Sequence, residues 1–191
     1  MFENATVGAE AFDSARDQSV DDGNASPGRV CSLVVFQLGA HHAAFPLEDI
    51  ERVAPMAELA VPPGMPSMLA GILNLSGAAV PVLLLDRLLQ LPETHLNLYS
   101  VLIILKDASE GRVAILADGI DRIVTVPESA LLSVGERNCF NACAGATVAL
   151  ADTNVSILVP SKILLEKERK ALVEFQCLAQ QRLREAGVTK Q

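Results

Sequence analysis

The sequence predicts a mainly β protein built from two small barrels, and three features of its 191 residues predict this. Short runs of β-branched and aliphatic residues recur along the chain, separated by turns rich in Gly, Pro, Asn and Asp. The runs form two series of similar length, which indicates two compact halves. One long stretch near the C-terminus has helical periodicity, so helix is a minor part of the fold.

The first half is expected to begin with a strand that ends at Gly39. The prolines and glycine of 62–66 exclude regular structure there. One helical turn is expected at 68–70, and a short helix at 87–91 that ends before Pro92. Pro81 lies inside an apolar run and lacks an N–H, which predicts a bulge or a sheet edge. The expected strands are 31–38, 43–47, 50–54 and 78–85.

The second half repeats this arrangement, with an irregular segment at 127–142. Residues 162–186 then place apolar side chains on one helical stripe with charges opposite, and Gly187 is a natural end. Such a helix packs on its own core or docks on a partner, and both readings stay open. The stripe is Leu164, Leu172, Phe175, Ala179 and Leu183; the expected strands are 100–105, 113–117, 120–126, 146–151 and 155–159.

Three parts of the chain follow from these elements. Residues 1–29 hold six acids and two bases and few large apolar side chains, which predicts a disordered acidic tail. Residues 30–165 form the folded domain, with a first barrel at about 30–95 and a second at about 98–160, either one after the other or intertwined. Residues 162–187 form the C-terminal amphipathic helix.

Composition excludes several classes of protein. A net charge of −8 disfavours a nucleic-acid partner, because a phosphate backbone would be repelled. Neither a secretory signal nor an apolar run long enough to cross a membrane is present, so we expect a cytoplasmic protein without membrane insertion. Its four cysteines are too few for a disulfide framework, and reduced thiols are expected.

The sequence offers little catalytic chemistry: it lacks a nucleophile elbow, a phosphate-binding loop and a dinucleotide fingerprint. His41-His42 lies in an expected turn, and neighbours on an extended chain point to opposite faces. Cys139 and Cys143 would meet on one helical turn, yet without a nearby His they suit small packed residues better than a metal or redox site. Asp118, beside a tight-turn Gly, is expected to cap a backbone N–H rather than act with Asp121 in acid–base chemistry. We therefore expect no catalytic residue, metal or cofactor.

A known family resembles this chain between about residues 31 and 165. Residues 66–82 read PSMLAGILNLSGAAVPV, which resembles the signature of CheW-like coupling proteins: Gly-Val-x-Asn-Leu-Arg-Gly followed by a hydrophobic-Pro-Val run. The segments 33–39, 45–53, 113–123 and 157–165 are similar to further family segments in the same order.

This resemblance implies two intertwined SH3-like five-stranded barrels and no catalysis. Family members bridge the regulatory domain of a CheA-type histidine kinase and the cytoplasmic tip of methyl-accepting receptors, and an apolar groove between barrels suits a helical hairpin. Carried over by position, the residues on partner-facing strands and the signature turn are Ile50, Arg52, Gly71, Asn74, Ser76, Gly77 and Gly119.

Four positions depart from the family pattern. Ser76 replaces the signature arginine, and Arg52 stands where an acid is common, which resembles a charge swap on one surface. Leu84 replaces the usual Asp, and Pro160-Ser161 interrupts the last segment. The leading hypothesis is an adaptor of a divergent chemosensory pathway. The alternatives are a ligand-binding, metal or redox module that uses Cys139 and Cys143, and a non-signalling paralogue.

Overall fold

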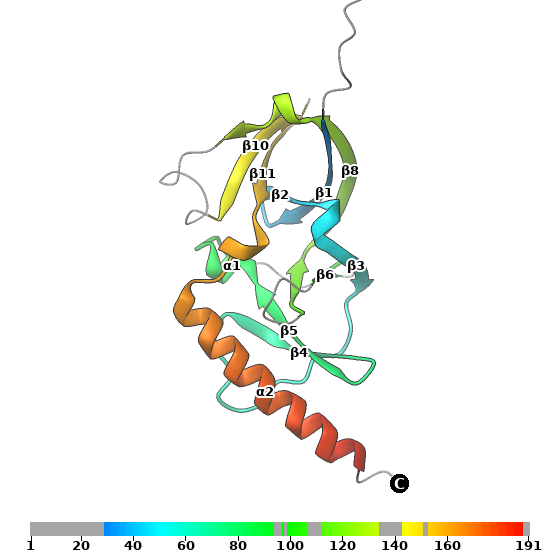
Figure 1. Ribbon diagram of the computed structural model, residues 1–191, viewed down its shortest axis with the longest axis vertical. Helices are drawn as coiled ribbons and strands as arrows, with labels where there is room; N and C mark the ends of the chain where they lie inside the picture. Colours follow the sequence, from blue (N-terminus) through cyan, green and yellow to red (C-terminus); the bar gives the residue numbers. More distant parts are fainter. Residues whose placement is uncertain are drawn as a thin grey trace, which may run out of the picture.

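A computed structural model of the protein describes residues 29–93, 97, 99–106, 112–133, 143–150 and 153–188 (Figure 1). The expected tail, apart from Arg29, and Cys139 lie outside the described residues. The fold is mainly β, as the sequence predicts, with eleven named strands and a single long helix in the described part of the chain. No helix in those ranges is long and apolar enough to cross a membrane.

The strands form two sheets. The first has the order β8-β1-β2-β11-β10-β9, and its sixth member is the two-residue β9, which pairs with β10 alone. Its strands are β1 Val30–Leu38, β2 His41–Pro46, β8 Gly119–Pro127, β9 Leu132–Ser133, β10 Ala144–Leu150 and β11 Thr153–Leu158.

The second sheet has the order β3-β6-β7-β5-β4 and comes from the middle of the chain. Residue Ala60 pairs with Ile72 of β4, so the segment that follows β3 covers the far edge of this sheet. Its strands are β3 Ile50–Pro55, β4 Leu69–Leu75, β5 Ala78–Leu84, β6 Val101–Leu105 and β7 Ala114–Ala117.

This topology corrects the expected split into barrels at 30–95 and 98–160. Strands β1 and β2 belong with β8–β11, because β2 pairs in parallel with β11 and β1 pairs with β8. Strands β6 and β7 belong with β3–β5, because β6 pairs with β3 and β7 pairs in parallel with β5. The two halves are therefore intertwined, as the family resemblance implies.

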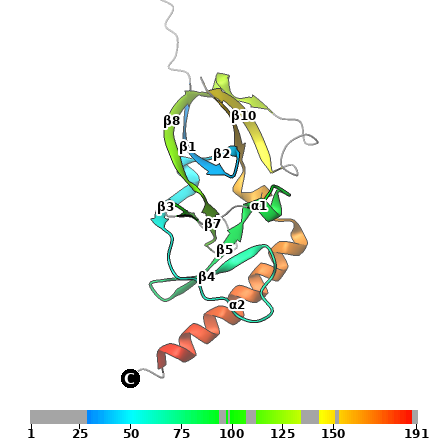
Figure 2. The same cartoon turned by 180° about the vertical axis from the view of Figure 1, so that it is seen from behind.

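A short helix and 3-10 turns lie between the strands, and η1, Leu47–Asp49, joins β2 of the first sheet to β3 of the second. The helix α1, Leu85–Leu88, begins two residues before the expected 87–91. The helix α2, Glu166–Val188, crosses the second sheet and packs on β5, which is visible from both sides in Figures 1 and 2. The 3-10 turns are η1 Leu47–Asp49, η2 Glu128–Ala130 and η4 Pro160–Lys162.

The largest apolar cluster contains residues of both sheets and joins them into one body. Phe36 of β1 and Phe45 of β2 are fully buried there, with their rings stacked at a centroid distance of 5.2 Å. Ile103 and Ile115 enter the same cluster from the second sheet, and Leu172 enters it from α2. Each sheet also encloses a smaller cluster of its own. Because apolar burial is the main stabilising term, this shared core fixes the sheets relative to each other.

The expected helical turn at 68–70 is wrong, since β4 begins at Leu69. Its hydrogen bonds explain why: Ile72 exchanges both backbone bonds with Ala60, and the strand's other edge pairs with β5. The local sequence favours a turn before Gly71, but pairing of β4 with Ala60 and with β5 makes these residues part of a strand.

Pro81 lies in β5, an interior strand of the second sheet rather than an edge strand, and it is one residue away from a register shift that marks a bulge on β4 at Ala70. It stands opposite Ile72, whose own backbone groups point toward Ala60, so the pair exchanges no ladder hydrogen bonds. The pairing of β5 with β7 begins one residue later, at Val82. The missing N–H of Pro81 thus falls at the end of a ladder, where no donor is required.

Candidate partner-binding surface

The signature stretch forms the β4–β5 hairpin, and its turn explains two of the signature residues. Ser76 and Gly77 have φ values of 52° and 87°, positive at both central positions as in a type I′ turn. The Asn74 side-chain Oδ1 accepts a hydrogen bond from the Gly77 N–H at 2.9 Å. Asn74 and Gly77 therefore build the turn. Ser76 is its exposed tip, in a conformation that strains a non-glycine residue.

Gly71 is buried where β4 passes close to the segment of Leu59 and Ala60. A Cβ at this position would lie 2.7 Å from Leu59 Cβ and 2.9 Å from the Ala60 carbonyl oxygen. Glycine thus permits the Ala60–Ile72 pairing that covers the edge of the second sheet. Gly71 can affect a partner only through the surface that it shapes.

The two β3 residues differ in exposure. Ile50 is 7% exposed and belongs to the shared core, whereas Arg52 is exposed. A register shift between them marks a bulge at Glu51, so this edge strand is locally irregular. Among the described residues the side chain of Arg52 makes no hydrogen bond or ion pair, while its backbone belongs to the ladder between β3 and β6. The neighbouring Glu51 forms an ion pair with Arg112, with Oε2 and Nε 2.9 Å apart. The guanidinium of Arg52 is therefore available to an acidic partner.

The structure brings β3 and the hairpin to one cleft. Its volume is about 350 Å³, and it lies between Glu51 of β3, the start of β5 and the side of α2. The lining residues are Glu51, Ala78, Ala79, Val80, Lys106, Arg112, Gln176 and Gln180. Neither Arg52 nor Gly77 lines the cleft, although each is next in sequence to a lining residue.

Gly119 belongs to the first sheet and does not line this cleft. It opens β8 beside Tyr99, which is 81% exposed, and a Cβ on Gly119 would stay 3.5 Å from the Tyr99 carbonyl oxygen. This exposed aromatic residue is a feature that the sequence reasoning did not select. The chain has a single Tyr and no Trp, and an aromatic residue that is this rare in a sequence could have indicated a contact residue.

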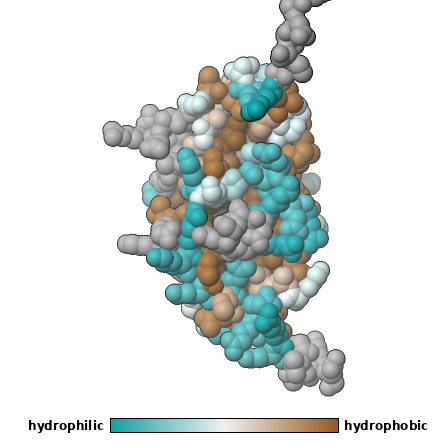
Figure 3. All heavy atoms as spheres, in the orientation of Figure 1, coloured by the Kyte–Doolittle hydropathy of each residue, from teal (hydrophilic) through white to brown (hydrophobic). Residues whose placement is uncertain are grey.

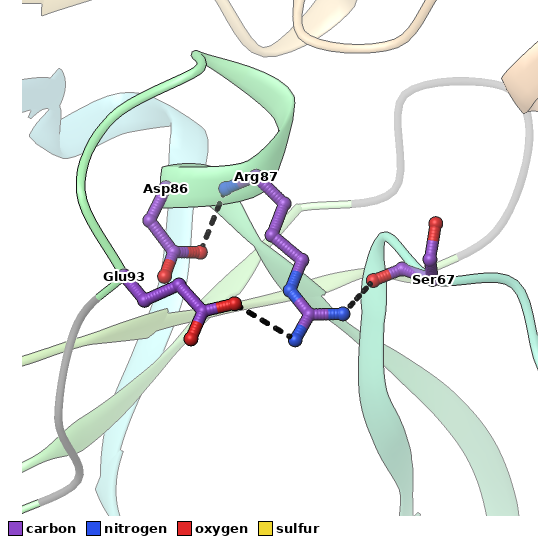
Figure 4. A network of polar contacts seen from close by, with 4 residues as sticks. All are labelled: Ser67, Asp86, Arg87 and Glu93. Carbon is purple, nitrogen blue, oxygen red and sulfur yellow. Dashed lines mark hydrogen bonds and ion pairs between the residues drawn. The ribbon is translucent and has the colours of Figure 1, made fainter.

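The shared core packs between the two sheets. A cavity of about 480 Å³ remains at its border, next to α1 and the start of α2. Arg87 fixes α1 near this border: its guanidinium donates to the Ser67 carbonyl at 2.9 Å and pairs with Glu93 at 3.4 Å (Figure 4). The buried Asp86 accepts a hydrogen bond from the Arg87 N–H.

The residues considered for chemistry have structural partners. The Asp118 carboxylate accepts the Gly39 N–H at 2.6 Å, which confirms the expected backbone cap, although it acts across 79 positions. The Cys143 thiol is buried and donates to the Lys162 carbonyl at 3.1 Å. Burial, with a smaller effect of Glu168, raises the pKa of this thiol and so lowers the fraction present as thiolate.

His41 and His42 open β2 rather than a turn, and His42 contacts Thr153 at 3.3 Å. The part of the chain that the structure describes contains no group of three or more metal-ligating side chains.

Comparison with known proteins identifies the family. The model of the CheW-like domain matches residues 32–168, which is most of the chain and includes both sheets. The chain belongs to the CheW-like domain family.

A solved structure with a similar fold is the scaffolding protein TtCheW from Thermoanaerobacter tengcongensis, with a TM-score of 0.64. The two sequences are 18% identical, and the alignment covers 69% of this chain and 86% of that one. No curated protein matches the sequence. The likeness shows that the two proteins share a fold.

Proposed function

We propose that this CheW-like protein is a non-catalytic adaptor that couples the cytoplasmic tip of a chemoreceptor to the regulatory domain of a CheA-type histidine kinase. The observation that carries this proposal is the exposed signature turn on a packed core, whose hairpin lines one cleft together with Glu51, the residue before Arg52. A surface of this kind suits recognition, because a packed scaffold holds exposed loops and strand edges in a fixed geometry.

The exposed residues divide the proposed site into a recognition part and a supporting part. Arg52 and Ser76 offer side chains to a partner, whereas Gly71, Asn74 and Gly77 shape the hairpin that carries Ser76. Figure 3 shows the hydrophobic side chains of the α2 face in small groups between hydrophilic ones. Such a mixed surface is typical of contacts with moderate affinity, whose combined strength comes from several contacts made at once, rather than of one large apolar interface.

A titration of the full chain against each partner tests the proposal. The probes are a purified kinase regulatory domain and a soluble fragment of a receptor's cytoplasmic tip, with binding measured by calorimetry. Arg52→Glu should weaken one of the complexes by about fivefold or more. One exposed ion pair contributes about 0.2–1 kcal/mol, and reversal of the charge adds repulsion.

Arg29→Glu is the matched control, since it makes the same charge change at an exposed site at the start of the first sheet. Equal affinities of the wild type and Arg52→Glu would show that Arg52 is not a contact. Failure of the wild type to bind either probe would reject the adaptor function and favour a non-signalling paralogue.

A further inference from the structure

The helix α2 extends beyond the domain that defines the family. The family match ends at residue 168, whereas α2 continues to Val188. In Figures 1 and 2 this added length lies across β4 and β5, on the hairpin that carries the signature turn. The part of α2 beyond the matched segment therefore covers a surface next to the proposed site.

Two glutamines of α2 satisfy the backbone of β5. Gln180 Oε1 accepts the Ala79 N–H at 2.8 Å, and Gln176 Nε2 donates to the Ala79 carbonyl at 3.1 Å. Gln180 Nε2 also donates to the Gly77 carbonyl at 3.0 Å. The strand β7 pairs only with the far end of β5, from Val82 onward. The helix thus supplies the hydrogen bonds that a neighbouring strand would otherwise make.

The apolar contact under this part of the helix is small. Ala179 packs on Ile72 and Ala79 in a cluster of three buried residues, with Phe175 and Leu183 at its border. By contrast, the preceding turn of α2 reaches the shared core through Leu172. A cavity of about 250 Å³ stays open beside the small cluster, lined by Ala60, Pro62, Ile72, Asn74, Ala179, Arg182 and Leu183. Few buried contacts and incomplete packing are the marks of a segment that opens locally before the core does.

We propose that the hairpin face under α2, namely Ile72, Ala79 and the β5 edge at Gly77, is a docking surface for an amphipathic helix of a protein partner. In the unbound protein, residues 176–183 of α2 occupy that surface. The present occupant shows which chemistry fits: amide side chains four residues apart with a small apolar residue between them. Ser76, the exposed tip, lies at the end of the same hairpin, so a helix seated there would continue the proposed site.

The inference rests on the proposed function, since the helical partner is the receptor tip. Binding there requires residues 176–183 of α2 to leave the surface. The apparent affinity is therefore the affinity of the open form multiplied by the fraction of molecules that are open. A substitution that weakens the packing of α2 on the hairpin should therefore strengthen binding of the receptor tip.

The test compares Ala179→Glu with Gln181→Glu in the full chain. Ala179→Glu places a charge in the small cluster, whereas Gln181→Glu makes a charge change on the exposed side of the same helix. Amide exchange measured by NMR at Ala79 reports seating directly, because this N–H bonds to α2 and not to a strand. Affinity for the receptor-tip fragment reports access to the surface.

For Ala179→Glu we expect exchange at Ala79 to rise about tenfold or more, with Ile103 in the core unchanged, and affinity for the tip to rise at least threefold. Gln181→Glu should match the wild type in both. If Ala179→Glu lowers the exchange protection of the core, Leu183→Glu replaces it, since Leu183 is only partly buried.

Increased exchange at Ala79 without a gain in affinity would overturn the inference, and so would equal exchange in the two helix variants. A gain for the kinase regulatory domain alone would overturn the choice of a helical partner. A tip fragment that binds every variant equally rejects this inference only, whereas a tip and a kinase domain that bind none of them reject the proposed function.

Discussion

Replacement of Gly71 by alanine tests whether this signature residue acts through packing or through a partner. The new Cβ would lie 2.7 Å from Leu59 Cβ, and ordinary contacts begin near 3.4 Å, so the crossing segment must move by about 0.7 Å. Part of the obstacle is the Ala60 backbone, which cannot rotate away as a side chain can. Two hydrogen bonds of 2.8 and 2.9 Å between Ala60 and Ile72 hold the segment in place.

The expected loss combines overpacking with weakened hydrogen bonds. Overpacking in a core costs about 1–3 kcal/mol, and each backbone hydrogen bond contributes about 0.5–1.5 kcal/mol. Restriction of the unfolded chain by alanine offsets about 0.4–1 kcal/mol. We therefore expect Gly71→Ala to lower the free energy of unfolding by about 2–4 kcal/mol, and Tm by about 5–15 °C.

Urea unfolding followed by circular dichroism measures this change, with Gly119→Ala as the control. A Cβ at Gly119 would have its nearest neighbours at 3.5 and 3.8 Å, both in Tyr99, so stability should change by less than about 0.5 kcal/mol. If Gly71→Ala is as stable as the wild type, the close approach is wrong. If it is stable yet fails to bind a partner, Gly71 is a contact residue after all.

Three further outcomes are expected. Ser76→Asn should raise stability by up to about 1 kcal/mol in urea unfolding, since Asn tolerates a positive φ and Asn-Gly favours a type I′ turn; a loss would contradict the turn. Burial of the Asp49 carboxyl, and to a smaller extent the negative charge of Glu48, raises its pKa in the folded protein. The protonated form therefore stabilises the fold, and this stabilisation is lost as the pH rises through the folded pKa. Asp49→Asn should therefore be more stable than the wild type at pH 7 and equal to it near pH 3; no gain at pH 7 would refute this. Iodoacetamide with peptide mapping should label the exposed Cys177 well before the buried Cys143 at pH 7.5, and equal rates would contradict the burial of Cys143.

The divided roles of the signature residues explain how the chain can keep the family hairpin and still present a different surface. The turn uses an acceptor at Asn74 and a positive φ at both Ser76 and Gly77, while the side chain of Ser76 points to no described partner and is exposed. An arginine at the tip, as in the family pattern, would extend a charge into solvent. Ser76 removes that charge, and Arg52 places one on β3. Both changes alter the charge of the exposed surface, and neither residue belongs to the buried core.

The sequence alone determined the fold class, most strand positions, the amphipathic C-terminal helix and the family, because short aliphatic runs and turn residues act locally. It also determined that Asp118 caps a backbone N–H, since that follows from the residue type next to a glycine turn. The partner of that cap, Gly39, is distant in the sequence, and only the tertiary structure identified it.

Tertiary structure decided which strands share a sheet, because parallel pairing of β2 with β11 and of β5 with β7 depends on contacts between distant segments. It made 68–70 part of a strand, since the Ala60 edge and β5 together satisfy backbone groups that a local turn would leave open. It also assigned Gln176 and Gln180 to the β5 edge, where side-chain amides replace a missing strand. Local periodicity identifies the apolar face of a helix, but what lies beneath that face is fixed by long-range packing.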